Sequence, residues 1–191
     1  QGLQLNTSPF SFEMHLFIPS IVNDNQIILQ RQSTSGSITL ALSHSVDTSA
    51  CKIVYLVGSG SDSYLVASGS ILKGQFNHIF AKVDDDVGGK KISIYNNLNL
   101  LATSSDIQDF GDINLSNTNL VIGSGSSISM LDYQFSPKHT LSGAIDDFRH
   151  YIGSRTISQV TGSYIRETYA TDDLALYFRF DEPNGDYDFN D

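Results

Sequence analysis

The stretch that decides the fold is Leu141–Ser158, which reads LSGAIDDFRHYIGSRTIS. After its glycine it alternates polar and apolar side chains like a strand, and it closes with a turn and the start of a short helix. Apolar side chains fall on both faces of such a strand, with Ala144, Phe148 and Ile152 on one face and Ile145 and Tyr151 on the other. Because both faces are partly buried, we predict an inner strand of a sheet.

Four further segments read as strands separated by polar turns, which is typical of an antiparallel meander. They are Gln26–Gln32, Ser37–Ser43, Cys51–Val57 and Tyr64–Ala67. The segment Phe10–Ile18 alternates most clearly and predicts a half-buried strand, with Phe10, Phe12, Met14, Leu16 and Ile18 on its inner face.

Length, cysteine count and net charge restrict the class of protein. A chain of 191 residues fits one domain that can bury a core without metals or disulfides. Cys51 is the single cysteine, so no internal disulfide can form, and we expect its thiol to be a small core group. The net charge of -10 argues against a nucleic-acid partner, and no apolar run is long enough for membrane insertion.

Three segments resemble the laminin G-like domains of the concanavalin A-like superfamily. The first is Gly-x-Ile-Asp-Asp-Phe-Arg-x-Tyr at 143–151, followed by Arg155-Thr-Ile-Ser158. The others are a central hairpin, from Gly74–Asp84 and Lys91–Thr103, and the strand Asn119–Ser124. They occur in family order and span about residues 10 to 165. The resemblance implies an all-β fold, a two-sheet antiparallel jelly-roll sandwich, but a fold shared by many proteins does not fix a function.

The C-terminal part predicts one short helix and a last strand. Ser158 caps a helix that reaches Glu167, with Val160, Tyr164 and Ile165 facing the body. Asp173–Asp181 follows as a strand. We expect residues 1–181 to form the domain and residues 182–191 to be an acidic linker or the start of another module. The chain begins at Gln1 without a methionine, so we expect a segment of a longer polypeptide.

The segment Asp84–Gly89, DDDVGG, lies between two strands, and its glycines supply the positive φ angles of a hairpin tip. Asp84, Asp85 and Asp86 then form either a solvated hairpin end or a site for Ca²⁺, which prefers oxygen ligands in loops of this kind. No other cofactor is indicated.

Ligand residues are expected on the loops Asp106–Leu120 and Ser126–Thr140. In pentraxins, which share the superfamily, the corresponding second segment contributes to the ligand or calcium site, and this resemblance points to Asp132 and Tyr133. The alternative is that Leu131 and Phe135 cover the end of the core. Tryptophan is absent, so Tyr55, Tyr64 and Tyr133 are the candidate aromatic platforms for a sugar, unless they belong to the core.

Glycoside hydrolases of this superfamily carry two carboxylates that face one cleft. The three glutamates here, Glu13, Glu167 and Glu182, have no acidic partner two residues away on a strand, so we predict that the chain is not an enzyme. It is expected to be a lectin-like interaction module of a larger extracellular, cell-surface or virion structural protein, with a protein partner. A carbohydrate-binding lectin domain is the alternative, and homo-oligomerisation stays open.

Overall fold

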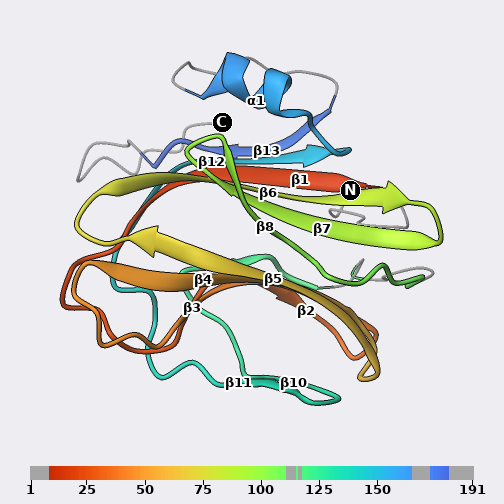
Figure 1. Ribbon diagram of the computed structural model, residues 1–191, viewed down its shortest axis with the longest axis horizontal. Helices are drawn as coiled ribbons and strands as arrows, with labels where there is room; N and C mark the ends of the chain where they lie inside the picture. Colours follow the sequence, from red (N-terminus) through yellow and green to blue (C-terminus); the bar gives the residue numbers. More distant parts are fainter. Residues whose placement is uncertain (1–8, 111–114, 116–117, 165–172, 181–191) are drawn as a thin grey trace, which may run out of the picture.

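The chain folds into a sandwich of two antiparallel sheets, as the computed structural model shows for residues 9–110, 115, 118–164 and 173–180 (Figure 1). One short helix lies on the outer side of the upper sheet, and a small hairpin lies on the outer side of the lower sheet. The predicted all-β jelly-roll architecture is confirmed.

The upper sheet has six strands, and β12 is one of its inner strands, as predicted. Its order is β13 (Leu174–Phe178), β12 (Ala144–Ile152), β1 (Phe10–Phe17), β6 (Phe76–Asp86), β7 (Gly89–Asn96) and β8 (Asn99–Thr103). The tip between β6 and β7 has Gly88 at φ 97° and Gly89 at φ 151°, as the hairpin prediction requires. The last strand is shorter than predicted, and Asp181 lies outside the described residues.

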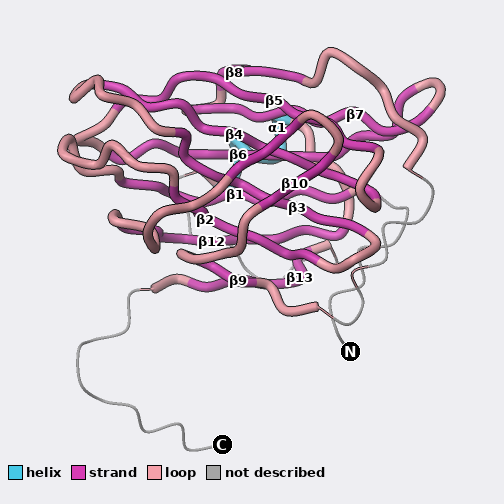
Figure 2. The backbone as a smooth tube through the Cα atoms, turned by 90° about the horizontal axis from the view of Figure 1, so that it is seen from below, coloured by secondary structure: helices cyan, strands magenta, loops and turns pink. Residues whose placement is uncertain are grey.

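The lower sheet has five strands in the order β5 (Ser63–Leu72), β4 (Ala50–Ser59), β3 (Gly36–Ser43), β2 (Gln26–Gln32) and β9 (Val121–Ile122). A separate two-stranded hairpin, β10 (Ile128–Met130) and β11 (Tyr133–Phe135), crosses its outer face (Figure 2).

The main core fills the space between the two sheets. The predicted inner face of β1 is confirmed, because all five of its apolar side chains are buried. The ring of Phe12 meets that of Tyr55 edge to face, with 5.6 Å between the centroids, and also packs against Phe148. Cys51 is a free, buried thiol in this core, as expected.

The predicted faces of β12 are wrong because the strand contains a bulge. Asp147 has a φ of 51°, and three residues of β12 span the distance that two residues of β1 span there. The extra residue brings Ile145 and Phe148 to the same inner side, where both pack on the core. Ala144, predicted to share a face with Phe148, lies beyond the bulge and is exposed. Ile152 stays in register with Phe10, on the face of Phe148, but is 60% exposed at the end of the strand.

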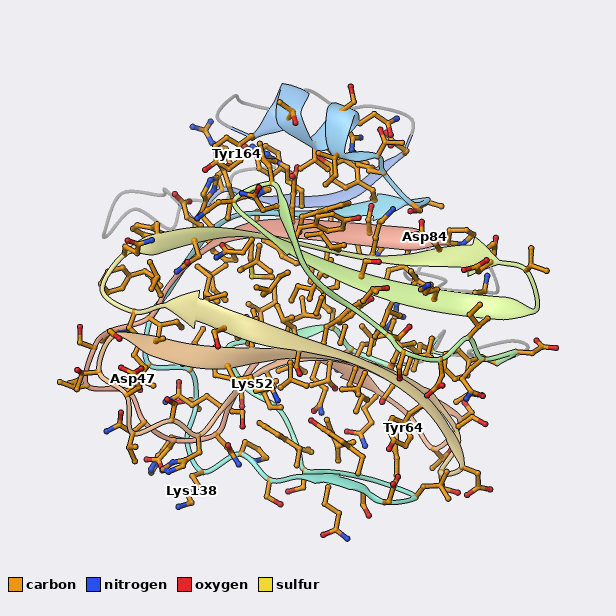
Figure 3. The ribbon with its side chains drawn as sticks, viewed as in Figure 1. Asp47, Lys52, Tyr64, Asp84, Lys138 and Tyr164 are labelled. Atoms are coloured by element: carbon orange, nitrogen blue, oxygen red, sulfur yellow. The ribbon has the colours of Figure 1, made fainter. Side chains whose placement is uncertain are left out.

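The outer face of β1 is also covered, so its half-buried prediction is wrong too. Glu13 is fully buried beneath α1 (Ile157–Ser163), and Ser11 is fully buried beneath the segment that leads into the helix, with hydrogen bonds to Gly153 and Arg155. The helix begins earlier than predicted, because its cap is Thr156 and not Ser158, and Thr156 forms a reciprocal pair with Gln159. Val160 and Tyr164 face the sheet as expected, with Tyr164 against His15 and His78 (Figure 3). Ile165 and Glu167 lie outside the described residues.

Candidate functional site

The candidate site lies where the tip of the β10–β11 hairpin meets the start of β5. The hairpin is held on the lower sheet by a second, smaller apolar cluster that is separate from the main core. Its buried members are Ile27, Ala41, Leu56, Ile128, Met130 and Phe135. Phe135 therefore covers the sheet, as the alternative interpretation of this loop expected, whereas Leu131 is 67% exposed.

Three predicted ligand residues come together at this tip. The Tyr64 hydroxyl donates a hydrogen bond of 2.6 Å to Oδ1 of Asp132. The rings of Tyr64 and Tyr133 lie 5.7 Å apart at an angle of 43°. Tyr64 comes from the sheet and the other two from the hairpin, so the pair joins residues 68 positions apart in the chain. Figure 3 shows Tyr64 on the hairpin side of the lower sheet.

The tip itself is a tight turn. Leu131 has a φ of 42°, in the left-handed region that a branched side chain rarely occupies. Its N–H donates to the carbonyl oxygen of Ser61 at 3.0 Å, which ties the tip to the turn between β4 and β5. The position of Asp132 is therefore fixed from both sides, by this backbone bond and by Tyr64.

A pocket of about 290 Å³ opens beside Tyr64. It lies between the β4–β5 turn, the segment after β8 and the hairpin tip. The lining residues are Asp62, Ser63, Tyr64, Leu65, Val66, Ser104, Ser105, Asp106, Gln108 and Leu131. Carboxylates, hydroxyls and an amide thus surround an aromatic ring, and none of these described lining residues is a lysine or arginine. Such a pocket can accept hydrogen bonds from hydroxyl groups and place an apolar face on the ring.

The charges at the tip follow from the tyrosine–aspartate hydrogen bond. That bond lowers the pKa of Asp132, because it stabilises the charged carboxylate. The same bond raises the pKa of Tyr64, because the phenol is its donor, and the nearby Asp106 charge adds to the effect. At neutral pH the pair is therefore a protonated phenol on an ionised carboxylate.

Tyr55 does not belong to this site, and its prediction as an aromatic platform is wrong. Its side chain is fully buried in the main core, against Phe12. Burial raises the pKa of Tyr55 well above its usual value.

The three aspartates at the end of β6 do not converge on one point, so the structure does not support the predicted calcium site. Asp84 pairs with Lys82 at 2.9 Å and accepts from Ser154. Asp85 pairs with Lys90, and Asp86 accepts from the N–H of Val87. No group of three or more metal-ligating side chains occurs among the described residues. Figure 3 shows Asp84 on the upper sheet, away from Tyr64.

Several lining residues were not predicted. Asp62 lies in the glycine- and serine-rich turn after β4, which the sequence identifies only as a turn. Ser104, Ser105 and Gln108 follow β8, close to or within a loop expected to carry ligand residues. The sequence feature that could have indicated these lining residues is the polarity of the two segments. Their position beside Tyr64 depends on the order of strands in the two sheets, which the sequence does not show.

The most strongly perturbed carboxyl group of the described chain is elsewhere, beneath α1. Burial alone would raise the pKa of Glu13, but the hydrogen bond and charge of His78, the Tyr151 hydroxyl and the charge of Arg149 together lower it to about 2. Ser163 of α1 also donates to it, at 3.1 Å. Both carboxylate oxygens of Glu13 are thus engaged inside the protein.

Among the described residues, no helix has the length and apolar character needed to cross a bilayer.

The chain belongs to the concanavalin A-like lectin/glucanases superfamily, whose laminin G-like family model matches residues 1–161. No curated protein sequence matches the chain.

Three solved structures illustrate the fold. A candidate carbohydrate-binding protein from Bacteroides ovatus has a TM-score of 0.61 at 17% identity, over 91% of this chain and 46% of that one. The SAP-like pentraxin of Limulus polyphemus has a TM-score of 0.56 at 15% identity, over 84% and 72%. Tailspike protein 2 of an Escherichia coli O157:H7 bacteriophage has a TM-score of 0.60 at 16% identity, over 92% and 24%. At these identities the likeness concerns the fold, and the chain spans about half the length of the Bacteroides protein.

Proposed function

We propose that this domain is a non-catalytic, glycan-binding module and that the pocket beside Tyr64 is its binding site. The observation that carries the proposal is the Tyr64–Asp132 pair, which holds an aromatic ring and an ionised carboxylate at the mouth of a polar pocket. A sugar ring has one or two apolar faces and a rim of hydroxyls, so it needs both kinds of group at once.

The chemistry of recognition follows from the lining. The carboxylates of Asp62 and Asp106 in the lining accept hydrogen bonds from sugar hydroxyls, as does that of Asp132, which follows the lining residue Leu131 and is bonded to Tyr64. Charged acceptors make the stronger bonds of this kind. The exposed side chain of Leu131 and the ring of Tyr64 supply apolar contact. Because the Tyr64 hydroxyl donates its proton to Asp132, its oxygen can only accept a hydrogen bond from a sugar.

The similar structures add support at the level of the fold. One is named a candidate carbohydrate-binding protein and another a phage tailspike, and the chain covers only 46% and 24% of them. We therefore propose that the domain is one module of a larger extracellular, cell-surface or virion protein. A non-catalytic role is favoured because Glu13, the one glutamate among the described residues, is buried and fully engaged.

A protein-binding assembly role is the second candidate. The observation that favours it is an aromatic pair in and just after β13, which is an edge strand of the upper sheet in the described part of the chain. Phe178 and Phe180 are 43% and 46% exposed, and their rings lie 5.8 Å apart. An exposed sheet edge with apolar side chains can pair with another chain.

A glycan array followed by calorimetry with the best-bound sugar tests the proposal. Tyr64→Ala and Asp132→Asn should each weaken binding by about tenfold or more, since each removes a contact at the pocket. Tyr177→Phe is the matched control, because it removes another tyrosine–aspartate hydrogen bond, of 2.7 Å to Asp147, on the other sheet. No binding to any sugar, together with self-association that Phe178→Ser abolishes, would replace the glycan role by the assembly role.

A further inference from the structure

A second concave surface lies on the other side of the β10–β11 hairpin, over β2 and β9. It is an open groove of about 700 Å³, larger than the Tyr64 pocket. Its lining residues are Gln30, Gln32, Ser33, Thr34, Thr118, Asn119, Val121 and Ser126. All but Val121 carry a neutral amide or hydroxyl group, and none of them can ionise.

The floor of this groove is a fixed amide. Gln30 is only 4% exposed, and its amide nitrogen donates to the carbonyl of Ser126 at 3.0 Å and to Thr39 at 3.3 Å. Its amide oxygen accepts from the N–H of Ser126 at 2.7 Å. The backbone closes tightly above it, because a Cβ on Gly125 would come within 2.6 Å of the Gln30 oxygen. These bonds hold the segment before β10 against the sheet and give the groove a rigid base.

The rim of the groove is formed by exposed amides. Gln32 continues along β2 from Gln30 on the same face of the sheet, and Asn119 lies opposite, just before β9. Both side chains are exposed. An amide offers a donor and an acceptor side by side, which matches a pair of neighbouring hydroxyls.

The groove and the Tyr64 pocket lie at the same end of the lower sheet. The β2–β3 turn borders the groove and the β4–β5 turn borders the pocket, and a hydrogen bond of 3.0 Å from the N–H of Gly60 to the carbonyl of Ser35 joins the two turns. Tyr64 is on β5 and Gln32 on β2, three strands away, so about 14 Å separate them across the sheet. That span exceeds one sugar unit but suits a short chain.

We propose that the groove is a second glycan subsite, which takes an uncharged, hydroxyl-rich part of an oligosaccharide whose other end occupies the Tyr64 pocket. This inference rests on the proposed glycan-binding function of that pocket. The preferred ligand is then a neutral chain of several sugar units, and its affinity depends on its length, because two linked contacts reinforce one another.

Calorimetry with neutral glucose oligosaccharides, linked α-1,4 or β-1,4 and ranging from disaccharide to octasaccharide, tests the subsite. The natural protein should bind the longer chains of one series about tenfold or more tightly than its disaccharide. The double variant Gln32→Ala/Asn119→Ala should bind the disaccharide unchanged and lose the gain with length. Tyr64→Ala should weaken binding at every length.

The matched control is Gln75→Ala/Gln134→Ala, which removes two exposed amides outside both sites and should keep the gain with length. Equal affinity for all lengths, or a gain that survives the Gln32→Ala/Asn119→Ala change, overturns the second subsite while leaving the Tyr64 pocket in place. Absence of binding to both series overturns the subsite as stated, and the glycan array then decides the proposed function separately.

Discussion

The Nη1 atom of Arg149 lies 3.2 Å from Oε1 of Glu13, and both side chains are about 1% exposed. The same carboxylate accepts from the hydroxyls of Tyr151 at 2.8 Å and Ser163 at 3.1 Å, and lies 3.1 Å from Nε2 of His78. Donors from β6, β12 and α1 thus meet on one residue of β1. We infer that Glu13 holds the helix on the upper sheet.

Removing this charge should destabilise the fold strongly. Glu13→Gln removes the buried countercharge of Arg149 and leaves its guanidinium only the partly exposed carboxylate of Asp147, at 3.4 Å. Breaking a buried pair in this way costs about 3–5 kcal/mol. Urea denaturation followed by circular dichroism measures the loss.

The control for that experiment is Asp24→Asn. Asp24 lies 3.6 Å from Lys138, whose side chain is 67% exposed, so the loss should stay below about 1 kcal/mol. A Glu13→Gln protein as stable as the Asp24→Asn protein would show that Glu13 does not hold the helix.

Stability should fall between neutral pH and pH 4 because of His150. Burial, with the nearby charge of Arg31, lowers the pKa of His150 from 6.5 to about 4. Above pH 6.5 the imidazole is neutral in both the folded and the unfolded chain. As the pH falls from there to about 4, only the unfolded chain takes up the proton, so the free energy of unfolding decreases by about 3 kcal/mol. Burial of the half-buried His15 lowers its pKa too, and so acts in the same direction.

Denaturation midpoints measured from pH 8 to 4 test this expectation. His150→Leu removes the titrating group but keeps an apolar side chain beside Phe10, so its profile should be flatter over that range. If the variant and the natural protein show parallel profiles, His150 is not the group responsible. Glu13 accounts for a separate fall below pH 4.5, since its carboxylate is stabilised only when ionised and its folded pKa is about 2.

The sequence is sufficient to predict the sandwich, because the alternation in β1 and the turn residues between strands are local signals. It is not sufficient to predict which faces of β12 are buried. One extra residue at Asp147 exchanges the inner and outer faces between the two parts of the strand. The alternation of polar and apolar residues in the sequence does not show where such a bulge lies. The burial of the outer face of β1 was not predicted either, because the helix that covers Glu13 comes almost 150 residues later in the chain.

The candidate site was predicted in part. Tyr64 precedes Leu65 and Ala67, which are buried in the core, so period two places Tyr64 on the outer face. Tyr55 lies in the run CKIVYLV, where the core covers one face and the hairpin the other. A continuous apolar run does not show which side chains face the main core. The sequence alone therefore could not assign Tyr64 to the candidate site and Tyr55 to the core.

Tyr55→Phe should leave both stability and glycan binding nearly unchanged. The Tyr55 hydroxyl is buried and makes no hydrogen bond to any residue that the structure describes, so its loss removes a polar group without breaking a pair. We expect the free energy of unfolding to stay within about 1 kcal/mol of the natural value or to rise slightly. Tyr55→Ala, by contrast, should cost about 3–5 kcal/mol through the cavity it leaves. Weaker sugar binding by a stable Tyr55→Phe protein would contradict the placement of this residue in the core.

Calcium should not stabilise the fold through the end of β6. A bound ion raises the melting temperature as its concentration exceeds its dissociation constant. Asp84 and Asp85 are instead paired with Lys82 and Lys90, and the lysine charges oppose a cation there. Melting curves in increasing calcium should therefore coincide with those in a chelator. The triple variant Asp84→Asn/Asp85→Asn/Asp86→Asn serves as the comparison: a calcium-dependent rise that this variant abolishes would restore the metal site, whereas a rise that it retains would place the ion elsewhere in the chain.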